Sequence, residues 1–478
     1  MVLDSESCYQ ALATHDRRFD GRFFVGVRTT GVYCRPVCGV RLPRRENCRF
    51  FMSAAAAEAG GYRPCLRCRP ELAPGLAGVD ASARFAQAAV RLIEEGVLEH
   101  GGVDALAARI GVTSRHVRRI FDAEFGVSPL EYAQTQRLLL AKRLLTDTSL
   151  PVVDVAFASG FKSLRRFNAL FRARYRMAPS SLRRAAAPRV LPGVMRFALA
   201  YRPPFDWDAL LAFLAARAIA GVEHVDRRRY ARTLAIPYRG GIAEGAIVVA
   251  HAPRHHAIRL DVSPGLACVV PAVIGKVRHA FDLGCDPVPI AARLGELAEA
   301  RPGLRVPGAC DGFELAVRAV IGQQISVAAA RTLLGRLAAT LGTPLAGGRE
   351  HGVERVFPGA AAIAARPIAE LAAIGLPKAR AQTLSELARR VASGALVLAP
   401  GADVERSMAA LETVRGIGRW TSSYIAMRAL GWPDAFLESD LGVLKALGET
   451  SAARARARSE AWRPWRAYAV FHLWSNHV

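Results

Sequence analysis

Long apolar segments and a secretion signal are both missing from this sequence. No run approaches the roughly eighteen apolar residues that a spanning helix needs, and the N-terminus MVLDSESCYQ lacks the basic and apolar regions of a signal peptide. Acidic residues are also scarce, because 41 Asp and Glu stand against 65 Lys and Arg and leave a net charge of +24. We therefore expect a cytoplasmic protein that binds a polyanion. Nucleic acid is the first candidate, and a ribosome or an anionic membrane surface is the alternative.

The texture of the chain changes several times, as expected for a multidomain α+β protein of 478 residues. An arginine-rich start is followed by sequence that reads as helices only. Segments 194–202 and 230–262 then alternate like half-buried antiparallel strands, and alanine-rich helical sequence begins near Gly265. We assign domains to 1–78, 82–184, 194–300 and 301–478, with the linker AAAPRVLPG at 185–193.

Disulfides are not expected, because only four of the nine cysteines stand in close pairs. Cys34 and Cys38 form C-x3-C, and Cys65 and Cys68 form C-x2-C after a gap of 26 residues. Two such pairs supply the four thiolates of a closed tetrahedral zinc site, which a module this small needs in order to fold. The spacing alone favours an inert structural zinc ion.

Two segments between 82 and 184 have the pattern of helix-turn-helix units. Each has small residues, a Gly turn, a Ser or Thr cap, and then a helix that carries basic residues. The side chains expected to face a DNA groove are Arg115, Arg118 and Arg119 in the first segment and Lys162, Arg165 and Arg166 in the second. A solvated basic face is the alternative for either segment alone.

The stretch LETVRGIGRWTSSYIAMRALGWPDAFLESD reads as helix, tight turn, helix and a loop with an acid. Gly416 and Gly418 let the turn approach an anion closely, and the helix that begins near Arg419 points its N–H groups at the same place. Asp440 follows about twenty residues later. The alternative is a helix-capping turn followed by a solvated loop acid.

The strings VRTTGVYCRPVC and GYRPCLRC resemble the N-terminal domain of Ada-type alkylation-response proteins, and the tandem helix-turn-helix pattern resembles the AraC-type DNA-binding domain. The first resemblance implies that Cys34 is both a zinc ligand and the acceptor of a methyl group from a methylphosphotriester in DNA. It also places Thr30, Arg41 and Arg67 at the DNA backbone. Double-stranded DNA and RNA polymerase are the implied partners, and no membrane is.

From Val194 onward, YRPPFDWDALLAFLAARA, FDLGCDP, ARPGLRVPG, GQQIS, GIGRW and WRPWRAYAVFHLW together are similar to AlkA-type 3-methyladenine glycosylases of the helix-hairpin-helix superfamily. The fold implied is a small antiparallel α+β subdomain followed by helical subdomains with a cleft. The resemblance implies a base pocket of Phe213, Trp420, Tyr424 and Trp474, with Asp440 as the catalytic carboxylate. Gln323 and Gln324 are expected at the DNA, with Gln324 filling the gap left by a flipped nucleotide, and a monovalent cation is expected at the hairpin turn.

Three positions qualify this reading. Bifunctional relatives carry a lysine just after the G-x-G turn, where this chain has Trp420, so base excision without strand cleavage is expected. Ser439 and Leu441 replace an acid and an aromatic residue beside Asp440, from which we expect a less polar and less aromatic pocket. No PCHR-type motif is present, so a transferase domain for O6-alkylguanine is not expected. The alternative to an enzyme fused to a regulator is a DNA-binding regulator with an inactive glycosylase scaffold.

Overall fold

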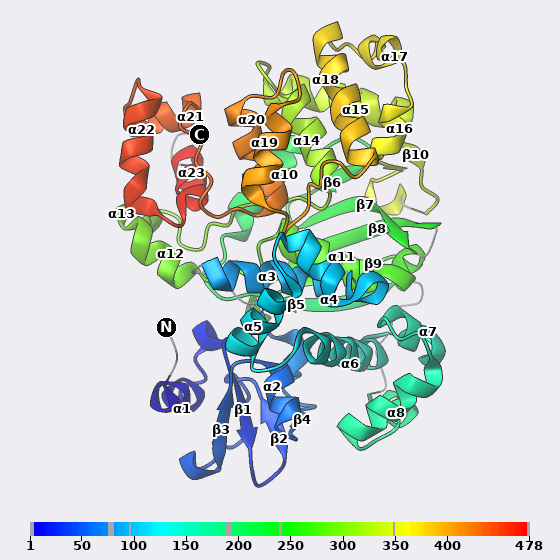
Figure 1. Cartoon of the computed structure of the whole chain (residues 1–478), viewed down its shortest axis with the longest axis vertical. Coiled ribbons are helices and arrows are strands. Elements are labelled where there is room, and N and C mark those ends of the chain that lie inside the picture. Colours follow the sequence, from blue (N-terminus) through cyan, green and yellow to red (C-terminus); the bar gives the residue numbers. More distant parts are fainter. Residues whose placement is uncertain are drawn as a thin grey trace. The chain divides into compact units, whose positions relative to one another are not determined.

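The computed structural model describes residues 4–74, 81–94, 97–148, 150–186, 194–238, 241–347 and 349–475 (Figure 1). The chain divides into two compact units: Met1–Pro203 with Ala252–Gly275 and Leu283–Asp286, and Pro204–His251 with Lys276–Asp282 and Pro287–Val478. The segment 194–300 contributes to both units, and residues 187–193 of the expected linker lie outside the described residues. None of the helices in the described ranges combines the length and hydropathy needed to cross a membrane.

The first unit begins with a small sheet in the order β3-β1-β2-β4. Its strands are β1 (Phe24–Val27), β2 (Val32–Cys34), β3 (Cys48–Phe51) and β4 (Arg63–Pro64). Successive residues of β1 point to opposite faces. Val25 packs with helix α1 (Ser5–Ala13), whereas Phe24 packs with Ala54 and Ala57 of helix α2 (Ala54–Ala59). Short 3-10 turns lie at η1 (Arg17–Phe19), η2 (Arg45–Asn47) and η3 (Pro70–Leu72).

The expected helical region follows and contains both helix-turn-helix units. Its helices are α3 (Ala81–Glu94), α4 (Val97–Ile110), α5 (Ser114–Phe125), α6 (Pro129–Asp147), α7 (Val152–Ala158), α8 (Leu164–Tyr175) and α9 (Pro179–Ala186). Helix α5 begins where the Thr113 hydroxyl accepts from the N–H of His116, and α8 begins where the Ser163 hydroxyl accepts from the N–H of Arg166. These side-chain caps satisfy backbone donors that a helix start leaves unpaired.

Strands occur where the sequence alternates. In the first unit β5 (Met195–Ala200) pairs antiparallel with β9 (Ala257–Val262). In the second unit β7 (Arg229–Tyr238) pairs antiparallel with both β6 (Glu223–Val225) and β8 (Gly241–Ala252). The turns η4 (Pro253–His255) and η5 (Pro264–Val269) flank β9, and α11 (Val270–Ala280) follows.

The remaining second unit is helical around α14 (Gly312–Ile321), in which eight of ten residues are buried. Figure 1 shows α18, α19 and α20 grouped near α14. The helices are α10 (Trp207–Arg217), α12 (Pro287–Leu294), α13 (Glu296–Glu299), α15 (Val327–Leu341), α16 (Ala360–Ala364), α17 (Ile368–Ala373), α18 (Lys378–Ala392), α19 (Val404–Glu412), α20 (Arg419–Ile425), α21 (Leu441–Leu447), α22 (Ala452–Ser459) and α23 (Arg466–Ser475).

Shorter elements complete the second unit. They are the turns η6 (Arg349–His351) and η8 (Glu460–Trp462) and a π-helical turn η7 (Ala426–Leu430), which continues α20. One detail corrects the expectation of an all-helical region from residue 301 onward. Strands β10 (Thr343–Pro344) and β11 (Arg355–Val356) form a small antiparallel pair there.

Candidate active site and metal centre

The four paired cysteines meet in one cluster in the first unit. The Sγ atoms of Cys34, Cys38, Cys65 and Cys68 all lie within 4.8 Å of one another. Zinc bound to four thiolates at about 2.3 Å holds its sulfur atoms about 3.8 Å apart, so the cluster fits this ion. Cys34 ends β2, and the two later ligands follow β4. The sheet therefore brings together ligand pairs that are far apart in the sequence.

The arginines around the cluster divide into two kinds. Arg35 is paired with Asp20, and its N–H donates to the Cys68 Sγ at 3.3 Å. Arg69 is held by Glu71 and Asp147. Thr30, Arg41 and Arg67, the residues expected at the DNA backbone, are instead exposed, and neither arginine has an ion pair within the described residues.

The cluster is also connected to helix α6. Lys142 is 1% exposed, and its Nζ donates to the Cys65 carbonyl at 3.2 Å and to the Glu71 carboxylate at 2.7 Å. Sequence reasoning missed this lysine, because nothing in the pattern of a basic helix distinguishes one buried cation from its exposed neighbours.

The basic side chains of the helix-turn-helix units are exposed to solvent. Arg115, Arg118 and Arg119 on α5 are exposed, as are Lys162, Arg165 and Arg166 near the start of α8. The apolar face of each helix is buried, with Val117 and Phe121 on α5 and Phe167 and Phe171 on α8. Each helix therefore presents a cationic face to solvent, as binding to a DNA groove requires.

A cavity of about 700 Å³ opens in the second unit, and its lining includes all five residues expected there: Phe213, Trp420, Tyr424, Asp440 and Trp474. They come from α10, α20, the N-terminus of α21 and α23. Residues more than 200 positions apart in the sequence therefore share one chamber.

Asp440 is the N-cap of α21, and three donors hold its carboxylate. Oδ1 accepts from the Val443 N–H at 3.0 Å and from Nε1 of Trp474 at 2.9 Å. Oδ2 accepts from Nε1 of Trp420 at 3.0 Å. A carboxylate offers about four acceptor positions, so one remains for a further donor such as water. The loop acid of the sequence analysis is thus a fixed group.

Two aromatic walls lead away from this carboxylate. On one side Trp420 stacks on Tyr424 with ring centroids 5.3 Å apart and planes 6° from parallel. On the other side Phe471 lies 5.0 Å from Trp474 and 5.2 Å from Phe213. Flat, electron-rich faces of this kind suit a planar, electron-poor ring.

The hairpin turn is built as the sequence indicates. Gly416 has φ +91, a conformation that favours glycine, and a Cβ there would lie 2.6 Å from the Thr383 Oγ1. Gly418 has an extended backbone, and a Cβ there would meet nothing within 4 Å. The turn therefore needs glycine at position 416 for its shape, whereas position 418 is open space.

The two glutamines have different surroundings. The Gln323 Nε2 donates to the Gly416 carbonyl at 2.9 Å and to the Thr421 Oγ1 at 3.0 Å, so this side chain supports the hairpin. Gln324 is exposed and has φ +58, which is uncommon outside glycine. Its backbone is held in an unusual conformation that projects the residue outward.

Several residues that line the cavity were not predicted from the sequence. Phe471, Arg217, Arg428 and Lys445 all line the cavity. Helical spacing would have found three of them, because Arg217 and Arg428 stand four residues after Phe213 and Tyr424, and Phe471 stands three before Trp474.

The pocket expected from Ser439 and Leu441 is not the one observed. Neither residue is among those that line the cavity, and Leu441 is 82% exposed. These two substitutions therefore change the surface beside Asp440 rather than the chamber, whose lining remains aromatic.

Four family models match successive parts of the chain. They are the metal binding domain of Ada at 7–71, a helix-turn-helix domain at 106–185, the AlkA N-terminal domain at 196–311 and the HhH-GPD superfamily of base excision DNA repair proteins at 317–466. A probable bifunctional transcriptional activator/DNA repair enzyme AlkA from Mycobacterium tuberculosis is 40% identical over 99% of this chain and 96% of its own length. The chain belongs to this AlkA-type bifunctional family.

Other relatives match either the C-terminal or the N-terminal part of this chain. DNA-3-methyladenine glycosylase 2 of Escherichia coli is 38% identical over 58% of this chain and 96% of its own length. The bifunctional transcriptional activator/DNA repair enzyme AdaA of Bacillus subtilis is 29% identical over 38% of this chain and 83% of its own length. The family is therefore a fusion of an Ada-type zinc and helix-turn-helix region with an AlkA-type helix-hairpin-helix glycosylase region.

Proposed function

We propose that this AlkA-type protein excises alkylated purines of the 3-methyladenine type from double-stranded DNA by hydrolysis. The observation that carries the proposal is Asp440, held by two indole N–H groups inside an aromatic chamber. An enzyme reaches a glycosidic bond only after the nucleotide leaves the base stack, and a chamber of about 700 Å³ admits a single base. Phe213, Trp420, Tyr424 and Trp474 form its walls.

In the proposed reaction the bond between the sugar C1′ and the base nitrogen breaks, and its electron pair leaves with the base. An N-alkylated purine is already a good leaving group, so no proton donor is required. The Asp440 carboxylate stabilises the positive charge that develops on the sugar. Water then adds to C1′ and loses a proton. The remaining acceptor position of Asp440 is suited to orienting that water.

We further propose that excision leaves the strand intact. Strand cleavage by a lyase requires an amine that forms an imine with C1′, and Trp420 occupies the position of the lysine in bifunctional relatives. Lys445, an exposed residue at the cavity, is the amine that tests this proposal. Borohydride should trap no covalent complex with wild-type protein, and a trapped complex that disappears in Lys445→Ala would overturn the proposal.

A second activity is proposed at Cys34, and the cluster of four Sγ atoms supports it. The Cys34 sulfur attacks the methyl carbon of a methylphosphotriester, an S–C bond forms, the C–O bond breaks, and an ordinary phosphodiester leaves. When bound, zinc keeps the attacking sulfur as thiolate at neutral pH. Loss of one thiolate charge then strengthens DNA binding and activates transcription together with RNA polymerase. Transcription with purified polymerase, before and after methylation, tests this regulatory step.

The DNA contacts that we propose are made by side chains that are exposed to solvent and, at the hairpin, by backbone N–H groups. Thr30, Arg41 and Arg67 bind the backbone beside the zinc centre, and the exposed arginines of α5 and α8 bind the groove. At the hairpin, N–H groups of the Gly416–Gly418 turn bind a phosphate, while Gln324 fills the gap in the duplex and Gln323 supports the turn. A monovalent cation at this turn is also proposed, since its carbonyls keep lone pairs.

One assay distinguishes the enzyme from a regulator with an inactive scaffold. Methylated duplex DNA is incubated with the intact protein, and free 3-methyladenine and 7-methylguanine are measured by chromatography. Release at a rate above that of DNA alone supports the glycosylase. No release, with DNA binding retained, leaves the regulator as the function.

A further inference from the structure

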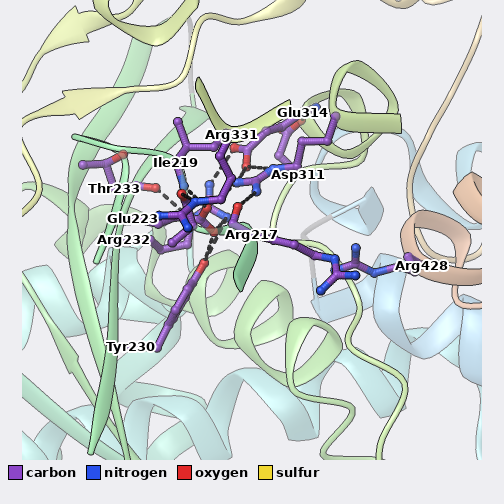
Figure 2. Close-up of polar contacts among 12 residues, drawn as sticks. Arg217, Ile219, Glu223, Tyr230, Arg232, Thr233, Asp311, Glu314, Arg331 and Arg428 are labelled. Atoms are coloured by element: carbon purple, nitrogen blue, oxygen red, sulfur yellow. Dashed lines mark hydrogen bonds and ion pairs between the residues drawn. The ribbon is translucent and has the colours of Figure 1, made fainter. Parts of the chain in front are cut away.

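Four charges beside the cavity neutralise one another. Arg232 donates to Glu314 at 2.7 Å (Figure 2). Arg318 binds both Glu223 at 2.5 Å and Glu314 at 2.6 Å. Although burial opposes ionisation of Glu223, the guanidinium groups of Arg318 and Arg232 lower its pKa to about 2. This quartet of two acids and two arginines is complete and carries no net charge.

Two further arginines that line the cavity, Arg217 and Arg428, are not neutralised in this way. Neither has a carboxylate within salt-bridge distance among the described residues. Arg428 is 6% exposed and donates to the carbonyls of Pro307 and Gly308 and, at 2.5 Å, to the Tyr424 hydroxyl. Its donors therefore bond two carbonyls and a hydroxyl, and no carboxylate among the described residues pairs with its charge.

The two guanidinium groups approach each other. Figure 2 shows Arg217 and Arg428 extending toward one another from different elements. Both lie over the ring of Phe213, with Cζ 3.9 Å and 4.8 Å from the ring centroid. Burial lowers the pKa of Arg217, and the like charge of Arg428 contributes to the same effect. One aromatic wall of the chamber is therefore already occupied by protein cations.

We infer that Arg217, supported by Arg428, is a specificity-determining residue that reads a carbonyl oxygen on the extruded base. A guanidinium donates to the O6 and N7 acceptors of a 6-oxopurine with two hydrogen bonds, whereas a 6-aminopurine presents a donor at that edge. The same pair of charges repels a base that is itself cationic after alkylation. Arg217 thus favours neutral bases with an exocyclic carbonyl and disfavours cationic 6-aminopurines.

This inference rests on the proposed glycosylase function and predicts that the two classes of base respond differently to the loss of Arg217. Arg217→Met should slow excision of hypoxanthine, a neutral 6-oxopurine, by about ten- to a hundredfold, as expected for lost hydrogen bonds from a charged donor. The same substitution should leave the release of cationic 3-methyladenine unchanged or make it faster. Effects on 7-methylguanine should fall between, because it keeps O6 but is cationic and blocked at N7.

The experiment uses the full chain and single-turnover rates. A duplex with one hypoxanthine and a methylated duplex are assayed with wild type, Arg217→Met and Arg217→Lys. The lysine variant keeps the charge but not the forked donor, so it should remain slow on hypoxanthine while 3-methyladenine release returns to the wild-type rate. Arg331→Met is the matched control. Arg331 also lines the cavity but is exposed, and within the described ranges its side chain bonds the Ala218 carbonyl alone, so its loss should change the release of both bases by the same factor.

The possible results distinguish failure of the proposed glycosylase function from failure of the specificity role of Arg217. If wild type releases none of these bases, the proposed function fails. If wild type releases them and Arg217→Met slows hypoxanthine and 3-methyladenine equally, the glycosylase stands and the specificity role is overturned, since uniform loss is what a structural role predicts. Slower release of hypoxanthine together with unchanged or faster release of 3-methyladenine confirms the inference.

Discussion

The Cys34 cluster of the first unit and the Asp440 cavity of the second hold their reactive atoms by different means. Cys34 is 6% exposed and lies among three other sulfur atoms within 4.8 Å. The Asp440 carboxylate has no charged partner among its hydrogen-bond donors, which are two indoles and one backbone N–H. The proposed thiolate is consumed once, because a thioether is not restored, whereas the carboxylate returns unchanged after each base. Anchoring by neutral donors suits a group that must turn over.

The largest expected effect is the loss of methyl acceptance when the Cys34 sulfur is removed. Cys34→Ala should abolish methyl acceptance completely, because no other group in the proposed mechanism can take the methyl. Base release should stay at the wild-type rate. Labelled methyl on the protein and free methylpurine are measured in the same reaction. Cys268→Ala removes an exposed thiol outside the cluster and should change neither. Methyl label on the Cys34→Ala protein would contradict the assignment.

The converse substitution tests the second site. Asp440→Asn should slow base release about a thousandfold, since the charge that offsets the developing sugar cation is lost in a largely desolvated site. One indole also loses its acceptor, because the amide N–H₂ cannot accept from it. Binding of damaged DNA should be retained or slightly tighter, and methyl acceptance should be unchanged. Glu438→Gln removes a nearby charge from outside the cavity lining and serves as the control. Near wild-type release by Asp440→Asn would remove this residue from the mechanism.

The hairpin offers a smaller effect that is confined to DNA binding by the second unit. Gly418→Asp should weaken binding of undamaged and damaged duplex by about tenfold, because it sets a negative charge where a phosphate approaches. Gly418→Ala adds a methyl group without charge, and it should lose less affinity than the Asp variant, since its Cβ meets no protein atom within 4 Å. Affinity is measured at several salt concentrations on a chain in which Arg115, Arg118 and Arg119 are replaced by Ala. Equal affinities of the Asp and Ala variants would make the turn a helix cap only.

The smallest expected effect concerns two buried glutamates, one in each unit, whose pKa values are shifted in opposite directions. Glu223 has a lowered pKa, whereas burial raises the pKa of Glu58 from its ordinary value of 4.5 to about 7, and Arg174 lies 3.9 Å from the Glu58 carboxylate. Native Glu58 therefore keeps a proton that the unfolded chain releases above about pH 4.5, so stability is lost as pH rises toward 7. Glu58→Gln should be more stable than wild type by about 1–2 kcal/mol at pH 8, and the gain should vanish near pH 5.

The two units can be followed separately in that experiment. All six tryptophans lie in the second unit, so tryptophan fluorescence reports its unfolding alone. Zinc release to a coloured chelator during urea titration reports the first unit. Glu46→Gln, at a 71% exposed side chain, is the control and should not shift the zinc midpoint. A Glu58→Gln midpoint that is lower at pH 8 would show that the ionised form is the stable one.

Local patterns in the sequence were sufficient for several features. Cysteine spacing predicted the cluster of four Sγ atoms, the pattern of a Ser or Thr cap predicted two helix starts, and G-x-G predicted the hairpin. The resemblance supplied Asp440 and the four aromatic residues, and the structure places all five in one cavity. These features depend on a few neighbouring residues, or on motifs that the family shares.

Features that depend on distant partners were not predictable. Sequence alone could not show that Lys142 is buried against Glu71, or that Arg217 and Arg428 meet with no acid beside them. The bond from the Gln323 side chain to the hairpin, 93 residues away in the sequence, also could not be predicted from the pattern around Gln323. The effect expected from Leu441 failed for the same reason, because the direction of a side chain at a helix start is set by the packing of other elements.

Asp440 is also the N-cap of α21, and this structural role limits which substitutions position 440 tolerates. Its Oδ1 accepts from Val443 and so closes the first turn of the helix. An alanine at position 440 would remove both the carboxylate and the N-cap of α21. Low activity of that variant could then come from the lost charge or from a disordered helix start. Asparagine is a good N-cap, so it removes the charge and the acceptor of one indole but keeps the helix start. If this side chain moved away from the indoles, the first turn of α21 would also fray. The position of the carboxylate and the order of the helix start therefore depend on the same contacts.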